Sequence, residues 1–238
     1  MGFSKYANRG AYHWDHISIL PWKYHCFTAA RYALVLEAAR ITPGEFVLDV
    51  GCGDGALSYL MYKKGGVITG IDPDPVGRDL AIEMFRLKNA EAEFLDSLYK
   101  VADMSQDVAI CAEVIEHVSD PVSLMRGIRR SLVPGGRMIL STPVKLTEHP
   151  LDSQHIREYF PNELEREVEK HFDIIEHRLA LPAFSVEMYY WRPFFFFHLP
   201  LIKLLMNILS AWFGIQVMRG VNSLNRYPTT QIVEAKRK

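Results

Sequence analysis

Cysteine is scarce in this chain of 238 residues. Its three cysteines, Cys26, Cys52 and Cys111, are widely spaced and form no CxxC pair. Three separated cysteines offer no even-numbered disulfide framework, which favours a reducing compartment. The first ten residues are polar and lack the apolar segment of a secretory signal. We therefore expect a cytoplasmic protein.

The chain also has no excess of positive or negative charge. The chain has 27 basic and 28 acidic side chains, which gives a formal net charge of −1. Such a balance provides no global attraction for nucleic acid or for an anionic membrane, although it leaves room for a local basic patch. We therefore expect no nucleic-acid partner.

No long apolar run is free of polar residues. The most apolar segment, residues 194–213, has the length of a membrane span, but Lys203 and other polar residues interrupt it. A lysine near the centre of a span costs about 3 kcal/mol. The apolar residues at helical spacing are Leu201, Leu204, Leu205, Ile208 and Trp212. We expect a helix packed on its own domain or on a second subunit. A peripheral membrane contact through residues 193–213 and a cover for an apolar substrate remain alternatives.

What the chain does have is a glycine-rich turn. The stretch from Phe46 to Leu57, FVLDVGCGDGAL, is an apolar run that breaks into three glycines before a predicted helix over 56–64. Glycines let the main chain approach a ligand closely, and a helix start offers unpaired N–H groups. The carboxylates of Asp49 and Asp54 fit a ligand with hydroxyl or ammonium groups better than one rich in phosphate. The GxGxxG fingerprint of dehydrogenases and the Gly-Lys-Ser/Thr of a P-loop are both absent from this turn.

Strands and helices alternate along the middle of the chain. The expected strands are 46–50, 67–71, 92–95, 107–111, 137–141, 172–179 and 229–236. The expected helices are 28–40, 56–64, 76–88, one that begins at Pro121 under an Asp120 cap, and 161–170. Thr28 is the predicted N-cap of the first helix, and 132–136 is a predicted turn. Repeated alternation of this kind predicts a parallel sheet with helices on both faces.

Polar side chains stand where the predicted strands end. Asp72 closes the second strand in IDPDP, about 20 positions beyond the glycine-rich turn, where a doubly wound fold holds ribose hydroxyls. A capping role before the next helix is the alternative. Glu113, Glu116 and His117 lie just past the fourth strand, on the edge where open α/β sheets bind ligands.

Two aromatic-rich regions lie outside this pattern. Residues 1–27 predict either a packed N-terminal arm or a lid over the ligand. Residues 182–227 predict an insertion or cap before the last strand. We therefore expect a single domain in which 28–181 form the core and 228–238 the last strand.

Five motifs in order resemble those of the class I S-adenosylmethionine-dependent methyltransferases. They are VLDVGCGDG, IDPDP, FLDS, AEVIEHV and LVPGGRMILSTP, and the resemblance covers about residues 28–180. It implies a Rossmann-like, seven-stranded, mostly parallel sheet with an antiparallel last strand. It also implies S-adenosylmethionine as cofactor and methyl transfer from its sulfonium. The segments EVIEHV and HIREYFPNEL are most similar to small-molecule methyltransferases of the quinone and natural-product type.

The resemblance also implies a cofactor site. Asp72 would hold the ribose hydroxyls, and Asp96 would accept a hydrogen bond from the adenine amino group. The other implied contacts are Asp49, Gly51 and Gly53 around the methionine part, Pro73 beside the adenine, Ser97 next to Asp96, and Ala112 and Glu113 along the methionine side. The expected reaction transfers a methyl group to a hydroxyl of a small apolar or aromatic metabolite.

A hydroxyl acceptor benefits from a base, and histidine has a pKa near the operating pH. His117 and His155 are the candidates, each with the alternative of a purely structural role, and His149 is a weaker one. Two other hypotheses remain. Glu113, Glu116, His117 and a distant histidine such as His155 resemble the metal site of small-RNA terminal 2′-O-methyltransferases. The near-neutral charge argues against an RNA substrate, and EVIEHV also occurs in metal-free relatives of the family. A non-catalytic cofactor-binding scaffold is the second.

Overall fold

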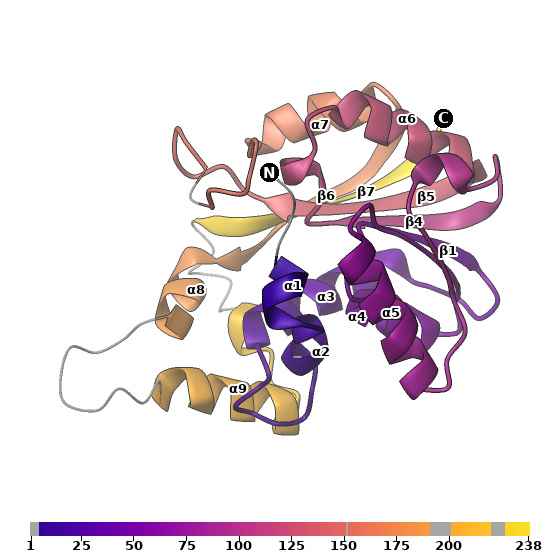
Figure 1. The fold of residues 1–238 in the computed structure, drawn as a ribbon. Helices are drawn as coiled ribbons and strands as arrows, with labels where there is room; N and C mark the ends of the chain where they lie inside the picture. The colour runs from indigo at the N-terminus through magenta and orange to yellow at the C-terminus, as the bar shows by residue number, and fades with distance from the viewer. Residues whose placement is uncertain (1–4, 151, 191–200, 220–226) are drawn as a thin grey trace.

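The computed structural model describes residues 5–150, 152–190, 201–219 and 227–238 (Figure 1). Within these residues, seven strands form one sheet in the order β3-β2-β1-β4-β5-β7-β6. The strands are β1 (Phe46–Val50), β2 (Val67–Ile71), β3 (Glu93–Leu95), β4 (Gln106–Ala112), β5 (Leu132–Pro143), β6 (Phe172–Pro182) and β7 (Pro228–Arg237). Only β7 runs against its neighbours, β5 and β6. The predicted mostly parallel sheet with an antiparallel last strand is confirmed.

Helices cover both faces of the sheet (Figure 1). They are α1 (Lys5–Arg9), α2 (Tyr12–His16), α3 (Cys26–Ala39), α4 (Ala56–Tyr62), α5 (Pro75–Leu87), α6 (Pro121–Ser131), α7 (Pro161–Glu169), α8 (Ala183–Tyr190) and α9 (Leu201–Phe213), with short 3₁₀ turns η1 (Leu98–Lys100), η2 (Ile115–His117) and η3 (Val217–Arg219). Neighbouring residues of β1 pack in the two hydrophobic cores on opposite faces of the sheet. Leu48 packs in the core with α6 and α7, and Val47 packs in the core with α3 and α4. Both are fully buried because successive strand residues point to opposite faces.

Two local predictions are wrong. The N-cap of α3 is His25 and not Thr28, because the His25 ring accepts a hydrogen bond from the Thr28 N–H at 3.3 Å. The predicted turn at 132–136 lies inside β5. Leu132 already pairs with Gln106, and the register then shifts so that Arg137 pairs with Val108. The extra residues between these pairs form an irregular section of the strand, which is why the sequence there is typical of a turn.

The insertion before β7 is helical where the structure describes it, in α8, α9 and η3. Residues 191–200 of the predicted apolar segment lie outside the described residues. None of the described helices is both long and apolar enough to cross a membrane. Leu201, Leu205 and Trp212 of the apolar stripe are 63 %, 55 % and 59 % exposed, so the described part of the chain does not cover them. The predicted packing on the chain's own domain or on a second subunit stays a prediction.

Candidate active site

The glycine-rich turn connects β1 to α4 at the carboxyl edge of the sheet. Gly51 and Gly53 have φ values of +73° and +53°, which glycine adopts without strain. A Cβ on Gly51 would also lie 2.4 Å from a Val114 methyl group. At the end of β1, the buried Asp49 carboxylate accepts a hydrogen bond from Ser58 Oγ at 2.5 Å. Burial raises the pKa of Asp49 to about 7.

Asp72 ties the end of β2 to this turn. One carboxylate oxygen accepts from the Gly53 N–H at 2.8 Å, and the other accepts from the Asp74 N–H at 2.9 Å. Burial raises the pKa of Asp72. The alternative capping role falls to Asp74, whose carboxylate accepts from Val76 N–H at the start of α5. Asp72 therefore faces the glycine-rich turn, with Pro73 exposed beside it.

Asp96 and Ser97 follow β3, the strand next to β2. Asp96 is exposed and pairs with Lys100 Nζ at 2.9 Å, and this hydrogen bond lowers the pKa of Asp96. Ser97 caps η1 by accepting from the Tyr99 N–H. The end of β3 is held to Asp72 by the Asp72 N–H, which donates to the Leu95 carbonyl. The two predicted nucleoside carboxylates therefore stand at the ends of adjacent strands.

Glu113 lies just past Ala112, the last residue of β4, in an unusual backbone conformation. Its φ is +57°, a left-handed value that costs energy for a residue with a Cβ. Its carboxylate accepts from Ser141 Oγ at 3.1 Å and pairs with Arg31 Nη1. Arg31 comes from α3, and its buried Nε has no hydrogen-bond partner among the described residues. Sequence reasoning missed Arg31, because a single arginine on an otherwise apolar helix gives no signal of its partner.

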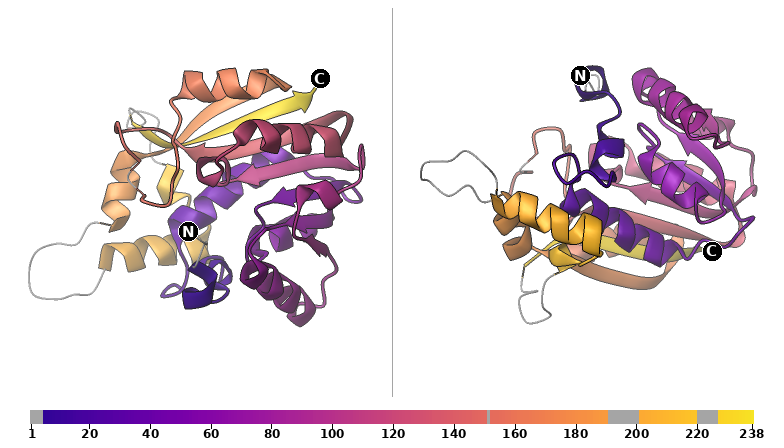
Figure 2. Two further views of the ribbon diagram at one scale, coloured as in Figure 1. Left: turned by 45° about the horizontal axis from the view of Figure 1, so that its top comes forward. Right: turned by 90° about the horizontal axis from the view of Figure 1, so that it is seen from below.

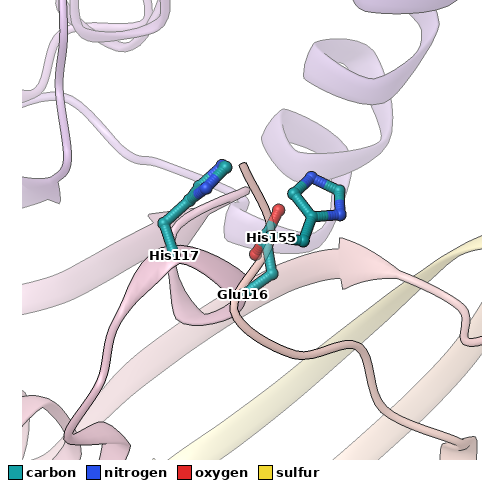
Figure 3. A group of neighbouring side chains, drawn as sticks. All are labelled: Glu116, His117 and His155. Atoms are coloured by element: carbon teal, nitrogen blue, oxygen red, sulfur yellow. The ribbon is translucent and has the colours of Figure 1, made fainter. Parts of the chain in front are cut away.

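Glu116, His117 and His155 come together beside Glu113 (Figure 3). Glu116 and His117 lie on η2, whereas His155 lies on the loop between β5 and α7. This loop is held by the Ile156 N–H, which donates to the Glu116 carbonyl at 2.8 Å. The two histidine rings meet edge to face with their centroids 5.0 Å apart. In the sequence these residues are grouped only through the family resemblance, because their meeting in space depends on the folding of the loop.

Burial favours the neutral forms of Glu116 and His117. Glu116 is fully buried, and burial raises its pKa well above the usual value. One of its oxygens accepts from Thr142 Oγ1 at 2.9 Å, and the other has no partner among the described residues. Burial lowers the pKa of His117. One ligand atom from each of Glu116, His117 and His155 lies within 4.8 Å of the others, so the three side chains have the spacing of a metal site. His149 is exposed and is not part of this cluster.

The N-terminal arm lies on the glycine-rich turn. Trp14 Nε1 donates to the Asp54 carbonyl at 2.6 Å, and the His13 N–H donates to the Asp54 carboxylate at 2.9 Å. Tyr6 is buried over Gly53, where an added Cβ would lie 1.8 Å from its hydroxyl oxygen. The arm therefore packs on the site, as both sequence-based alternatives require, and its role as a lid stays a prediction.

A separate hollow of about 800 Å³ lies at the opposite edge of the sheet. It is lined by Phe46, Val67, Glu93 and Gln106, which begin β1, β2, β3 and β4. Because ligands of open parallel sheets bind at the carboxyl ends of the strands, this hollow is not the candidate active site.

Several curated relatives share the core of the chain. The ubiquinone biosynthesis O-methyltransferase of Vibrio vulnificus (strain YJ016) is 38% identical over 123 residues, 50% of this chain and 52% of the relative. The corresponding Idiomarina loihiensis protein is 37% identical over 103 residues, 42% of each chain. The chain thus spans about half the length of the curated relatives it matches.

Solved structures of low sequence identity share the fold. The PH0226 protein from Pyrococcus horikoshii OT3 superposes with a TM-score of 0.63 at 15% identity, with both chains fully covered. Coclaurine N-methyltransferase bound to N-methylheliamine and SAH gives a TM-score of 0.61 at 19% identity over 88% of this chain and 72% of that one. Residues 23–181, more than half of the chain, match the family described as "Methyltransferase domain". The chain therefore belongs to the methyltransferase-domain family, as the order of its motifs predicts.

Proposed function

We propose that this protein transfers a methyl group from S-adenosylmethionine to a hydroxyl group of a small apolar or aromatic metabolite. The observation that carries the proposal is the meeting of the glycine-rich turn, Asp72, Glu113 and the His117–His155 pair at one edge of the sheet. The relatives that bear the name of ubiquinone biosynthesis O-methyltransferase support an oxygen acceptor on a small molecule. They do not favour an RNA terminus or a scaffold without turnover.

The residues at this edge fit the proposed cofactor. Gly51 and Gly53 have positive φ values, which glycine adopts without strain and which allow the main chain of the turn to approach a ligand closely. Asp72 would accept from the ribose hydroxyls, and Asp96 from the adenine amino group. The buried Arg31 Nε has a hydrogen to donate to the carboxylate of the methionine part. The cofactor itself supplies an activated methyl group, so the protein has to position the acceptor and remove its proton.

The two histidines are placed to accept that proton. His117 Nδ1 lies 3.0 Å from the Gln154 carbonyl, which can only accept, so we assign the ring hydrogen to Nδ1. His155 Nδ1 lies 2.7 Å from a Glu158 carboxylate oxygen, which leads to the same assignment. With this assignment Nε2 carries the lone pair of a neutral ring, and His155 Nε2 lies 3.9 Å from a carboxylate oxygen of Asp152. Because burial lowers the pKa of His117, this ring is neutral near pH 7 and ready to act as a base.

The test uses His117→Ala and His155→Ala with labelled cofactor and a panel of small phenols and catechols. We expect a loss of turnover of about 10²-fold or more for the variant that removes the base, with nearly normal binding of S-adenosylhomocysteine by calorimetry. His149→Ala, at an exposed position, is the matched control. If both variants remain fully active, neither histidine is the base. Cofactor binding without labelling of any acceptor would favour the scaffold.

A second candidate mechanism uses a divalent cation, and one specific observation favours it. One carboxylate oxygen of Glu116 and one ring nitrogen each of His117 and His155 lie within 4.8 Å of one another, and one buried oxygen of Glu116 has no hydrogen-bond partner among the described residues. A cation there would lower the pKa of an acceptor hydroxyl. Activity that EDTA abolishes and Mg²⁺, Mn²⁺, Co²⁺ or Zn²⁺ restores would support this mechanism. Activity that chelation leaves unchanged would support the metal-free base, which was the expectation from sequence.

Two further expectations stay predictions. One is the cytoplasmic location. The other is a peripheral membrane contact or a homodimer through residues 193–213, of which the structure describes residues 201–213.

A further inference from the structure

Helix α9 exposes its apolar residues and buries a polar one. In this helix, all of which is described, the one buried residue is Asn207, at 2 % exposure. Leu205 and Phe213 are 55 % and 67 % exposed. A helix on a protein surface normally turns its apolar stripe to the core and its polar face to water. The reversed arrangement leaves the leucines and aromatic residues of α9 without cover from the described part of the chain.

Part of the N-terminal arm extends this exposed surface. Trp212 Nε1 donates to the Ile19 carbonyl at 2.9 Å, and the Tyr24 hydroxyl lies 2.9 Å from Ser210 Oγ. Figure 2 shows α9 as an outer helix on one side of the molecule. Ile19 and Trp22 of the arm are 75 % and 71 % exposed. We call this surface the apolar edge, and it consists of Ile19, Trp22, Leu205, Trp212, Phe213 and Ile215.

The sequence around α9 is also free of negative charge. From residue 188 to residue 233 there is no Asp or Glu, although the whole chain contains 28. The same stretch contains Arg192, Lys203, Arg219 and Arg226. Arg219 pairs with Glu37 on α3, and Lys203 Nζ lies 5.0 Å from the centre of the Tyr189 ring. Residues 188–233, which contain α9 but not Ile19 and Trp22, therefore have a net positive charge in a chain that is close to neutral, and Lys203 and Arg219 are the two of these basic residues that the structure describes.

We propose that the apolar edge binds the interface of an anionic lipid bilayer. Exposed Leu, Phe and Trp side chains, with basic residues and no acidic ones in the same segment, are typical of a helix that lies in a membrane interface. With 13 residues, α9 is about 20 Å long, too short for a hydrocarbon core of about 30 Å. A second copy of the chain fits less well. A twofold interface would place this positively charged segment against itself.

The apolar edge is connected to the candidate active site through Asn207. Its side-chain oxygen accepts from the Cys26 N–H, at the first residue of α3, the helix that also carries Arg31. A bilayer at this edge would therefore contact α9, the helix that packs on the start of α3. This consequence rests on the proposed function: the methyl acceptor would be a lipid-soluble molecule that enters from the membrane.

Vesicle flotation of the full chain tests the proposal. We expect the protein to float with phosphatidylcholine vesicles that contain phosphatidylglycerol, and to bind pure phosphatidylcholine about tenfold more weakly. The double variant Leu205→Glu/Phe213→Glu should lose binding to the anionic vesicles by about tenfold or more. The control Leu87→Glu/Tyr99→Glu changes two exposed apolar residues, 60 % and 83 % exposed, on α5 and η1, and should bind like the wild type.

Three results would overturn the proposal. The first is a wild-type protein that floats with neither kind of vesicle. The second is a variant that binds as the wild type does while circular dichroism shows that it is folded. The third is light scattering that finds a wild-type dimer which the variant abolishes, because the edge would then be a subunit interface. Flotation needs neither cofactor nor acceptor, and S-adenosylhomocysteine binding is measured separately, so failure here is distinct from failure of the proposed function.

Discussion

At the scale of single residues, Asp72 shows how one carboxylate serves both the fold and the site. Its two oxygens hold the Gly53 and Asp74 N–H groups, so it fixes the path of the glycine-rich turn and of the loop after β2. A carboxylate oxygen accepts more than one hydrogen bond. Asp72 can therefore keep these contacts and still bind the ribose hydroxyls that we assign to it.

We expect Asp72→Ala to weaken binding of S-adenosylhomocysteine by about 1 to 3 kcal/mol, because hydrogen bonds to a charged acceptor are lost. Titration calorimetry measures the change. Asp79→Ala is the control, since Asp79 is exposed on the neighbouring helix α5. An unaltered affinity in the Asp72 variant would mean that the ribose lies elsewhere.

At the scale of elements, the start of α3 depends on two histidines of the arm. His25 caps the helix, and its ring stacks on that of His16 with the centroids 4.5 Å apart. Burial lowers the pKa of His16 to about 4 and that of His25 to about 3. The charge of His13 is a further cause for His16, and the charge of His16 is a further cause for His25. Both rings are therefore neutral in the folded protein near pH 7.

This arrangement makes stability depend on pH. In the unfolded chain these histidines bind protons as the pH falls below about 6.5, whereas in the folded chain they stay neutral down to about 4 and 3. We expect the contribution of these two histidines to the free energy of unfolding to be highest above pH 6.5 and to fall as the pH is lowered through this window, whereas the raised pKa of Asp49 contributes the opposite dependence. His25→Asn keeps a capping acceptor and removes one titrating group. Urea unfolding between about pH 7 and pH 5 should show that the free energy of unfolding depends less on pH in this variant than in the wild type. An equal pH dependence in the two proteins would contradict the lowered pKa of His25.

At the scale of the whole molecule, the two aromatic-rich regions outside the core contact each other. They are the N-terminal arm and the described part of the insertion before β7. Asn207 of α9 donates to the carbonyls of Pro21 and Tyr24 at 2.8 and 2.6 Å. It accepts from the Cys26 N–H and from the Tyr189 hydroxyl, both at 3.2 Å. One buried amide thus joins the arm, α3, α8 and α9, although more than 180 residues separate the arm from α9.

Replacement of the Asn207 side chain should destabilise the packing of the arm, α3, α8 and α9 on one another. We expect Asn207→Leu to lower the free energy of unfolding by about 2 to 4 kcal/mol, because several buried polar partners lose their hydrogen bonds. Ser210→Ala, which removes one contact with Tyr24 on the same helix, should cost less than about 1.5 kcal/mol. Urea denaturation compares the two variants, and equal stabilities would show that Asn207 is not the junction.

Local patterns were sufficient for the core of the fold. The apolar run over 46–50 predicts β1, and Asp120 with Pro121 predicts the start of α6, where the Asp120 carboxylate accepts from the Ser123 N–H at 3.0 Å. Such signals are confined to a few neighbouring residues, so a single sequence carries them. The N-cap of α3 was missed because His25 is set in place by the arm, through its N–H bond to the His16 carbonyl.

The sequence by itself determined the alternating strands and helices, the glycine-rich turn and the acidic residues at the strand ends, because hydrophobic period and glycine placement are local properties. Tertiary structure decided which distant groups meet. It paired Arg31 with Glu113, brought His155 to His117 and turned the apolar side of α9 outward. These contacts depend on how loops and added helices pack on the sheet, and residues far apart in sequence carry no local sign of that packing.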